Sequence, residues 1–271
     1  MLKDVTLGQY YPTGSMVHKL DPRIKILISF IFIISIFFVN SYISYAIEFI
    51  FVFLIAYLSK VPFKMILKGL KPLRYIIIIT IIINLLFTTA GNVVFEYGII
   101  KITDEAIDLS IKMPLRLTLL VMGTSLLTLT TSPVQLTDGI EGTLKPFKKI
   151  GLPSHEIAMM ITIALRFIPT LIEETDKIMK AQLARGANFE SKNLITRAKS
   201  MVPLIVPLLI NALERADELA IAMEARCYNG DEGRTKLHQL KLYITDIVVF
   251  IIMNILSNKF NSFKSFNNIW F

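Results

Sequence analysis

The sequence predicts an all-α, polytopic membrane protein with about five transmembrane helices and a cytoplasmic domain of two long helices that cross. Three observations support this fold class. The 271 residues are 54% hydrophobic and their mean hydropathy is +0.59, well above an ordinary soluble domain. Apolar runs of nearly spanning length recur along the chain. The loops between these runs alternate between basic and acidic composition, as expected for a chain that crosses a membrane repeatedly.

Five apolar segments are predicted to cross the bilayer, each within a few residues of the roughly 20 that a spanning helix needs. At the start of the first, Asp21 can cap the helix and Pro22 suits the first helical position. Arg23 and Lys25 are expected to anchor this end in anionic headgroups. The predicted spans are residues 24–39, 42–58, 73–89, 107–129 and 242–256.

The charges of the loops predict their sides of the membrane. The loop after the second span carries four lysines and Arg74, whereas the loop after the third carries four acidic residues against Lys101 alone. Because cytoplasmic loops are rich in lysine and arginine, the amino terminus is expected inside the cell and the carboxyl terminus outside. The expected parts are an N-terminal membrane domain of residues 1–131, a cytoplasmic domain of residues 132–241, and a last helix with its tail, residues 242–271.

Two further apolar stretches, residues 157–172 and 201–213, compete with this topology. The first is interrupted by Arg166 and Pro169, and the second is short and contains two prolines. If both crossed, the basic connection between them would face outward, against the positive-inside bias. We therefore expect two long cytoplasmic helices, at about residues 154–185 and 200–227.

Nearly the same tripeptide ends both of these helices. Ala184-Arg185-Gly186 closes the first, and Ala225-Arg226-Cys227 closes the second. Basic residues are common in last helical turns and glycine is common just after them, so capping alone explains either tripeptide taken singly. Two occurrences, each with a small residue before the arginine, favour a device that grips a partner. Cys227 is the only cysteine, so it cannot form an internal disulfide.

Small residues predict where the two helices cross. Ala212, Ala216 and Ala220 recur at every fourth position, and Ala181 lies near the end of the other helix, so the backbones can approach closely there. Alanine is also the best helix former, and that alternative stays open for each of the four. A stripe of period 3.6 is expected to form the packing face of the second helix. The stripe consists of Met201, Ile205, Leu208, Ala212, Ala216, Leu219 and Met223.

Motifs for common catalytic chemistry are absent from the sequence: it contains no G-x-x-x-x-G-K-[ST], H-E-x-x-H or G-x-S-x-G. We expect no catalytic residues, no cofactor and no metal site, because the three histidines lie outside the predicted spans. Glu173-Glu174 is interpreted as a solvated face, and Arg116, inside the fourth span, as a structural residue. The net charge of +8 is explained by cytoplasmic loops, so a nucleic-acid partner is not indicated.

Five elements in order resemble the transmembrane T component (EcfT-type) of energy-coupling factor transporters, and the resemblance covers nearly the whole chain. These elements are Gln9-Tyr10-Tyr11-Pro12 with Leu20-Asp21-Pro22-Arg23-Ile24-Lys25, Leu127-Thr128-Leu129-Thr130-Thr131-Ser132-Pro133, Ala164-Leu165-Arg166-Phe167-Ile168-Pro169, and the two terminal tripeptides.

The resemblance implies a non-enzymatic scaffold in the cell membrane. Two crossing cytoplasmic helices would bind two ABC-type ATPase subunits, and a separate membrane-embedded S component would capture a vitamin or a metal. Arg185 and Arg226 would insert into grooves of the two ATPases. Cys227 stands where the family more often has glycine, and because cysteine adopts a positive φ less readily, the cap geometry there is an open question. Two alternatives remain: a conventional ABC importer permease that binds substrate itself, and an intramembrane enzyme.

Overall fold

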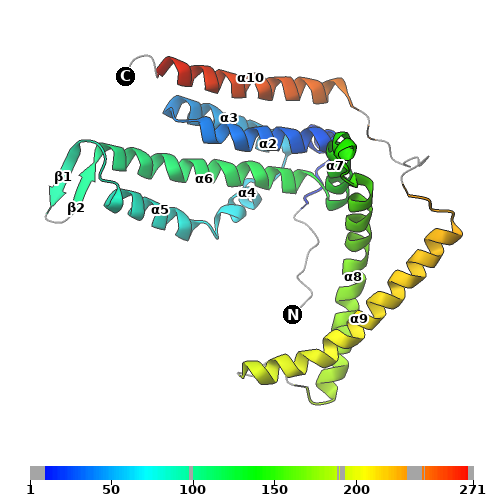
Figure 1. Cartoon of the computed structure of the whole chain (residues 1–271). Helices are drawn as coiled ribbons and strands as arrows, with labels where there is room; N and C mark the ends of the chain where they lie inside the picture. The colour runs from blue at the N-terminus through cyan, green and yellow to red at the C-terminus, as the bar shows by residue number, and fades with distance from the viewer. Residues whose placement is uncertain are drawn as a thin grey trace. The chain divides into compact units, whose positions relative to one another are not determined.

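The structure is a computed structural model that describes residues 10–97, 100–187, 189, 193–230, 240 and 242–267. Within these residues the chain is helical apart from one two-stranded hairpin (Figure 1). The elements are α1 (Met16–Lys19), α2 (Pro22–Phe38), α3 (Tyr42–Ser59), α4 (Phe63–Leu70), α5 (Arg74–Phe87), β1 (Val93–Tyr97), β2 (Ile100–Thr103), α6 (Asp104–Thr130), α7 (Pro133–Leu144), the 3-10 turn η1 (Lys145–Ile150), α8 (Ser154–Ala184), α9 (Leu194–Ala225) and α10 (Ile244–Asn267).

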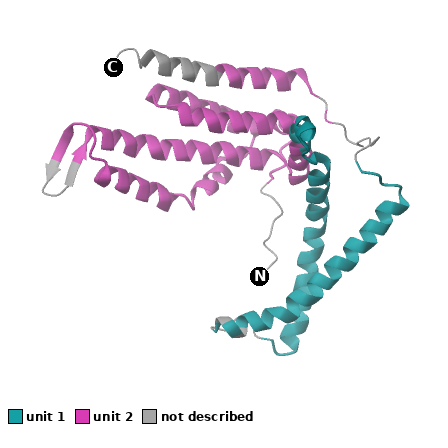
Figure 2. Ribbon diagram, viewed as in Figure 1, with its two compact units in different colours: residues 1–7, 141–239 teal, residues 8–140, 240–271 magenta. Residues whose placement is uncertain are grey.

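The chain divides into two compact units, coloured separately in Figure 2. The membrane unit comprises residues 8–140 and 240–271, and the helix-pair unit comprises residues 1–7 and 141–239. The division falls inside α7, later than the expected boundary at residue 132. The physical reason lies at Gly139, where a Cβ atom would lie 2.8 Å from Ile26 Cδ1 and 3.0 Å from Pro22 Cβ. This glycine lets α7 pack directly on α2, so most of α7 belongs to the membrane unit.

Several helices meet the length and composition of a membrane span. Within the described residues these are α3, α6 and α8, and α4 with α5 makes a fourth if this pair, bent by 54°, is one span. The expected third span corresponds to α5, which is only 14 residues long. α2 has 17 residues, and the apolar part of α10, Ile244–Ile255, is also short. Composition alone allows α8 to cross, and its cytoplasmic placement remains our prediction.

A hairpin lies between α5 and α6, where the sequence predicted only a loop. β1 and β2 pair antiparallel, with Val93 opposite Thr103 and Phe95 opposite Ile102, and the register shifts between Val93 and Phe95. Thr103, which is 1% exposed, ends β2 and caps α6, because its hydroxyl accepts a hydrogen bond from the Ala106 N–H at 3.2 Å. The hairpin thus sets the first residue of α6.

The core of the membrane unit is apolar and is formed mainly by α2, α3 and α6, with contributions from α4 and α10. Gly123 on α6 permits the close approach, because a Cβ atom there would lie 2.2 Å from Phe32 Cε1. Arg116, also on α6, donates to the Val39 carbonyl at 3.1 Å, which satisfies a carbonyl at the end of α2. Its contact is with another helix end, consistent with the structural interpretation of this intramembrane cation. The buried core includes Phe32, Ile36, Val52, Ala56, Leu119, Met122 and Leu126.

Buried polar groups hold the start of α2. The Asp21 carboxylate accepts from the Arg23 N–H at 2.9 Å, which confirms the predicted cap. Asp246 at the start of α10 is fully buried and accepts from the Asp21 N–H at 3.0 Å and the Tyr243 N–H at 2.8 Å. One carboxylate therefore joins two helix starts that are 225 residues apart in the sequence.

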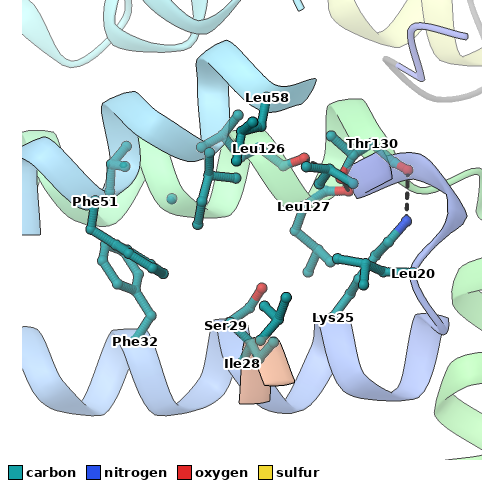
Figure 3. Close-up of a pocket in the computed structure, with 15 residues that line it drawn as sticks. Leu20, Lys25, Ile28, Ser29, Phe32, Phe51, Leu58, Leu126, Leu127 and Thr130 are labelled. Carbon is teal, nitrogen blue, oxygen red and sulfur yellow. Dashed lines mark hydrogen bonds between the residues drawn. The ribbon is translucent and has the colours of Figure 1, made fainter. Parts of the chain in front are cut away.

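Lys25 belongs to the same buried group, and the expectation that it anchors in headgroups is wrong. Its side chain is 6% exposed, and its ammonium donates to the carbonyls of His18 at 3.0 Å and Thr130 at 3.1 Å. Figure 3 shows this ammonium pointing toward Thr130 at one end of an apolar cavity of about 140 Å³. Phe32, Phe51 and other apolar side chains of α2, α3 and α6 line the cavity. Two backbone carbonyls replace the water that Lys25 loses on burial.

Candidate partner-binding site

α8 and α9 form an antiparallel pair within the helix-pair unit, and Figure 1 shows them crossing. Residues late in α8 contact residues early in α9: Gln182 Nε2 lies 3.5 Å from the carbonyl oxygen of Pro203. Further along, Glu174 of α8 forms an ion pair with Arg215 of α9. The helices are thus held together by specific polar contacts at successive levels.

The Gln182 contact follows from the prolines of α9. In a helix the carbonyl of residue 203 would accept from the N–H of residue 207, but Pro207 has no N–H. The Pro203 carbonyl is therefore left without its helical partner, and Gln182 on the neighbouring helix supplies a donor at 3.5 Å. The hydrogen bond that Pro207 removes from α9 thus leaves a carbonyl that contacts α8.

The Glu174–Arg215 pair was missed by the sequence interpretation, which placed Glu174 on a solvated face. The two side chains are only 17% and 30% exposed, respectively. Glu174 Oε2 is buried and has no hydrogen-bond partner among the residues that the structure describes, so the charge of this carboxylate depends on the arginine. No local pattern could have revealed the pair, because its members are 41 residues apart.

Arg185 ends α8 in a Schellman turn. The Gly186 N–H donates to the Leu183 carbonyl at 3.0 Å, and the Ala187 N–H donates to the Gln182 carbonyl at 3.0 Å. Gly186 has a φ of +85°, the left-handed conformation that this turn needs. The turn therefore ends the helix sharply just after the arginine.

Arg226 ends α9 in the same way. The Cys227 N–H donates to the Glu224 carbonyl at 2.9 Å, and the Tyr228 N–H donates to the Met223 carbonyl at 3.0 Å. Cys227 has a φ of +55°, so it occupies the position of Gly186 in the other turn despite its side chain. This settles the open question of cap geometry: the cysteine leaves the Schellman turn intact, at the cost of a left-handed conformation that cysteine disfavours.

The two arginines lie at opposite ends of the helix pair. Arg226 lines a pocket together with Thr162, near the start of α8, whereas Arg185 ends α8. The 23 residues from Thr162 to Arg185 rise about 35 Å at 1.5 Å per helical residue. All six residues of the two tripeptides are exposed, namely Ala184, Arg185, Gly186, Ala225, Arg226 and Cys227.

The alanines predicted at the crossing do not mediate the described interhelical contacts. Ala181, Ala216 and Ala220 are exposed, and only Ala212 is half-buried. High helix propensity explains the three exposed alanines. The predicted packing stripe needs the same correction, because Met201 and Ile205 are exposed. The partly buried face of α9 instead consists of Leu204, Pro207, Leu208, Asn211, Ala212, Arg215, Leu219 and Met223.

A third contact closes the other end of the pair. The hydroxyl of Tyr228, two residues beyond Arg226, lies 3.3 Å from Nε2 of the buried His155, whose Nδ1 lies 3.2 Å from Glu141 Oε1. The turn that carries Arg226 is thereby attached to the first turn of α8. In the part of the chain that the structure describes, no group of three or more histidine, cysteine or acidic residues is arranged to hold a metal ion.

Comparison with known proteins identifies the family. Residues 13–237 match the family described as cobalt transport protein (CbiQ). The energy-coupling factor transporter transmembrane protein EcfT of Clostridium kluyveri is 53% identical over 264 residues, which cover 95% of this chain and 98% of the relative. The protein of the same name from Thermosediminibacter oceani is 52% identical, covering 94% of this chain and 96% of its own. That from Bacillus subtilis is 45% identical, with 95% and 97% covered.

The matched residues 13–237 include most of the membrane unit up to α7, and the helix-pair unit with both arginine-bearing turns, but not α10. The chain therefore belongs to the cobalt transport protein family and is a transmembrane component of the energy-coupling factor transporter type.

Proposed function

We propose that this protein is the non-enzymatic coupling subunit of an ATP-driven importer of the energy-coupling factor type. In this role α8 and α9 transmit the conformational change of two ABC-type ATPase subunits to a membrane-embedded S component, which captures the substrate. One observation carries the proposal: two Schellman turns of the same geometry expose Arg185 and Arg226 at opposite ends of one helix pair.

The spacing of the arginines supports two separate partners. A separation of about 35 Å along α8, from 23 residues at 1.5 Å each, is comparable with the diameter of a small domain, so one small groove cannot hold both side chains. ATPase subunits that close on ATP can move a membrane protein only through a stiff connection. An arginine supplies strong, directional attachment to carboxylate or carbonyl oxygens. The arginines would thus attach the ATPases, and the two helices would carry the motion.

The proposal requires the helix-pair unit to lie in the cytoplasm of the cell, with residues 132–241 and the amino terminus inside. Cys227, the only cysteine, is exposed and tests this placement without any substitution. A membrane-impermeant thiol reagent should leave it unmodified in intact cells and should modify it in inside-out membranes. Modification in intact cells would place Arg226 outside and would exclude contact with a cytoplasmic ATPase.

The substrate that we propose is a vitamin delivered by the S component, with a cobalt ion as the alternative that the family's description names. Co-expression with candidate S components and ATPases, followed by uptake of labelled vitamins and of cobalt, distinguishes the two. ATP-dependent uptake of a vitamin supports the first, and uptake of cobalt alone supports the second.

The decisive experiment reverses both charges, Arg185→Glu with Arg226→Glu. Two attractions become repulsions, so the ATPase subunits should no longer co-purify, and transport should stop while substrate capture by the S component persists. A matched control reverses two exposed charges elsewhere on the helix pair, Lys177→Glu with Arg197→Glu. Both double variants must keep wild-type abundance and protease pattern. If the Arg185/Arg226 variant bound the ATPases as the wild type does, these arginines would act only as helix caps, and the proposed role would be refuted.

A further inference from the structure

A pocket of about 580 Å³ lies between α8 and the end of α9, and the turn after Arg226 forms part of its wall. Its walls include Thr162 and Arg166 from α8, and Arg226, Cys227 and Tyr228 from the end of α9. Arg166 belongs to the Ala164-Leu165-Arg166-Phe167-Ile168-Pro169 segment, to which the proposed function gives no role. The structure therefore brings an arginine of unassigned role into the same pocket as a proposed attachment residue.

The charges in this pocket are unbalanced. Arg166 and Arg226 both line it, and none of the residues that line it is an aspartate or a glutamate. Both arginines are exposed, and neither has an ion pair or a side-chain hydrogen bond to any residue that the structure describes. Like charges that share a pocket repel each other, and an anion placed between them relieves the repulsion.

We propose that Arg166 and Arg226 together bind one carboxylate side chain of an ATPase subunit in this pocket. The inference rests on the proposed function and adds a second cation and a specific ligand chemistry to it. A carboxylate has two oxygens with about four acceptor sites, and each arginine offers a planar fork of donors that matches them. Asn229 lines the same pocket and adds a further polar group beside an entering anion.

The first test is the affinity of the purified full-length protein for its ATPase subunits. Arg166→Gln should weaken binding by a factor on the order of ten to a hundred, because a hydrogen bond to a charged group is lost. Arg166→Lys should fall between this variant and the wild type, since it keeps the charge and loses the fork. The control is Arg197→Gln, which removes an exposed arginine of the same helix pair that does not line the pocket and should bind as the wild type does.

Combining the two substitutions tests whether the arginines share one ligand. If Arg166 and Arg226 bind the same carboxylate, the loss in Arg166→Gln/Arg226→Gln should differ from the product of the two single losses. Losses that multiply independently would show separate ligands and would overturn the inference. Wild-type binding by Arg166→Gln together with weakened binding by Arg226→Gln would refute the shared pocket and leave the proposed function standing. Wild-type binding by Arg226→Gln would refute both.

Because Cys227 lines the pocket, the rate at which a thiol reagent modifies it measures whether the pocket is occupied. Added ATPase subunits should slow its modification by a thiol reagent in the wild type, and Arg166→Gln should need a correspondingly higher ATPase concentration for the same protection. If ATPase subunits protected Cys227 equally in Arg166→Gln and in the wild type at every ATPase concentration, this result would contradict a role for Arg166. Protection by vesicles of anionic lipid without any ATPase would assign the pocket to a lipid phosphate and would also overturn the inference.

Discussion

The Glu174–Arg215 pair should control the angle between α8 and α9. In Arg215→Gln the carboxylate of Glu174, 17% exposed and with one oxygen already unpartnered, loses its counter-charge. Removing one member of a buried pair costs about 3–5 kcal/mol, and an exposed pair is worth about 0–1 kcal/mol. For this half-buried pair we expect about 1–3 kcal/mol of lost interhelical stabilisation. Arg226 lies 11 residues beyond Arg215, about 17 Å along α9. A rotation of α9 by about 10° about Arg215 therefore moves Arg226 by about 3 Å.

Pulsed EPR on the full-length protein measures this movement directly. One spin label goes on Cys227 and the second on Met160→Cys, an exposed position near the start of α8. Arg215→Gln should broaden the distance distribution and lengthen its mean, whereas Glu174→Gln/Arg215→Gln should restore much of the wild-type distribution, since no charge is then left unpaired. Glu174→Arg/Arg215→Glu, which re-forms the pair in reverse, should do the same. Unchanged distributions in all three variants would refute the assignment of this pair as the element that sets the angle.

Three further predictions follow from single positions. Cys227→Gly should preserve ATPase co-purification, whereas Cys227→Val should reduce it, because a β-branched residue in the left-handed conformation costs about 1–2 kcal/mol and disturbs the turn that carries Arg226; equal co-purification would show that this turn is not required. Gly123→Leu should destabilise the membrane unit by about 1–3 kcal/mol through overlap with Phe32, seen as a lower thermal midpoint in detergent, and an unchanged midpoint would contradict the close packing. Burial lowers the pKa of His18, so the unfolded chain binds this proton more readily. The contribution of His18 to folding stability is then complete above pH 6.5 or so, the ordinary pKa of histidine, and is lost as the pH falls toward the lower pKa of His18 in the folded protein. Thermal midpoints should therefore fall more between pH 7.5 and pH 5.5 or so in the wild type than in His18→Gln, and parallel curves would exclude the linkage.

The residues whose roles were predicted correctly act on their immediate neighbours. Asp21 caps the helix that begins one residue later, and Pro22 occupies its first position. α8 begins and ends close to the predicted residues, and α9 ends close to its predicted end, because last turns are encoded within a few positions. The start of α9 was predicted at about residue 200, but the helix begins earlier, at Leu194. Hydropathy likewise reports the affinity of each segment for lipid from the residues of that segment alone.

Predictions failed where a side chain's environment depends on a distant segment. Lys25 was assigned to the membrane surface because it follows Arg23 at a helix start, yet the Thr130 carbonyl, 105 residues away, binds its ammonium inside the protein. Ala216 and Ala220 fit a close-packing spacing, but α9 turns Arg215 toward α8 and leaves those alanines exposed. The sequence pattern of a helix can be compatible with packing on more than one face. Which face packs depends on the neighbouring helix.

By itself, the sequence determined that the chain is helical and membrane-embedded, that two long helices each end in an arginine, and that it resembles a particular transporter component. Only the tertiary structure decided that these arginines lie at opposite ends of one antiparallel pair, that Cys227 adopts the same turn as Gly186, and that Arg166 and Arg226 share a pocket. The physical reason is the range of the interactions. Caps, periodicity and hydropathy act over a few residues, whereas the Glu174–Arg215 pair and the pocket join positions 41 and 60 residues apart, whose meeting depends on how whole helices pack.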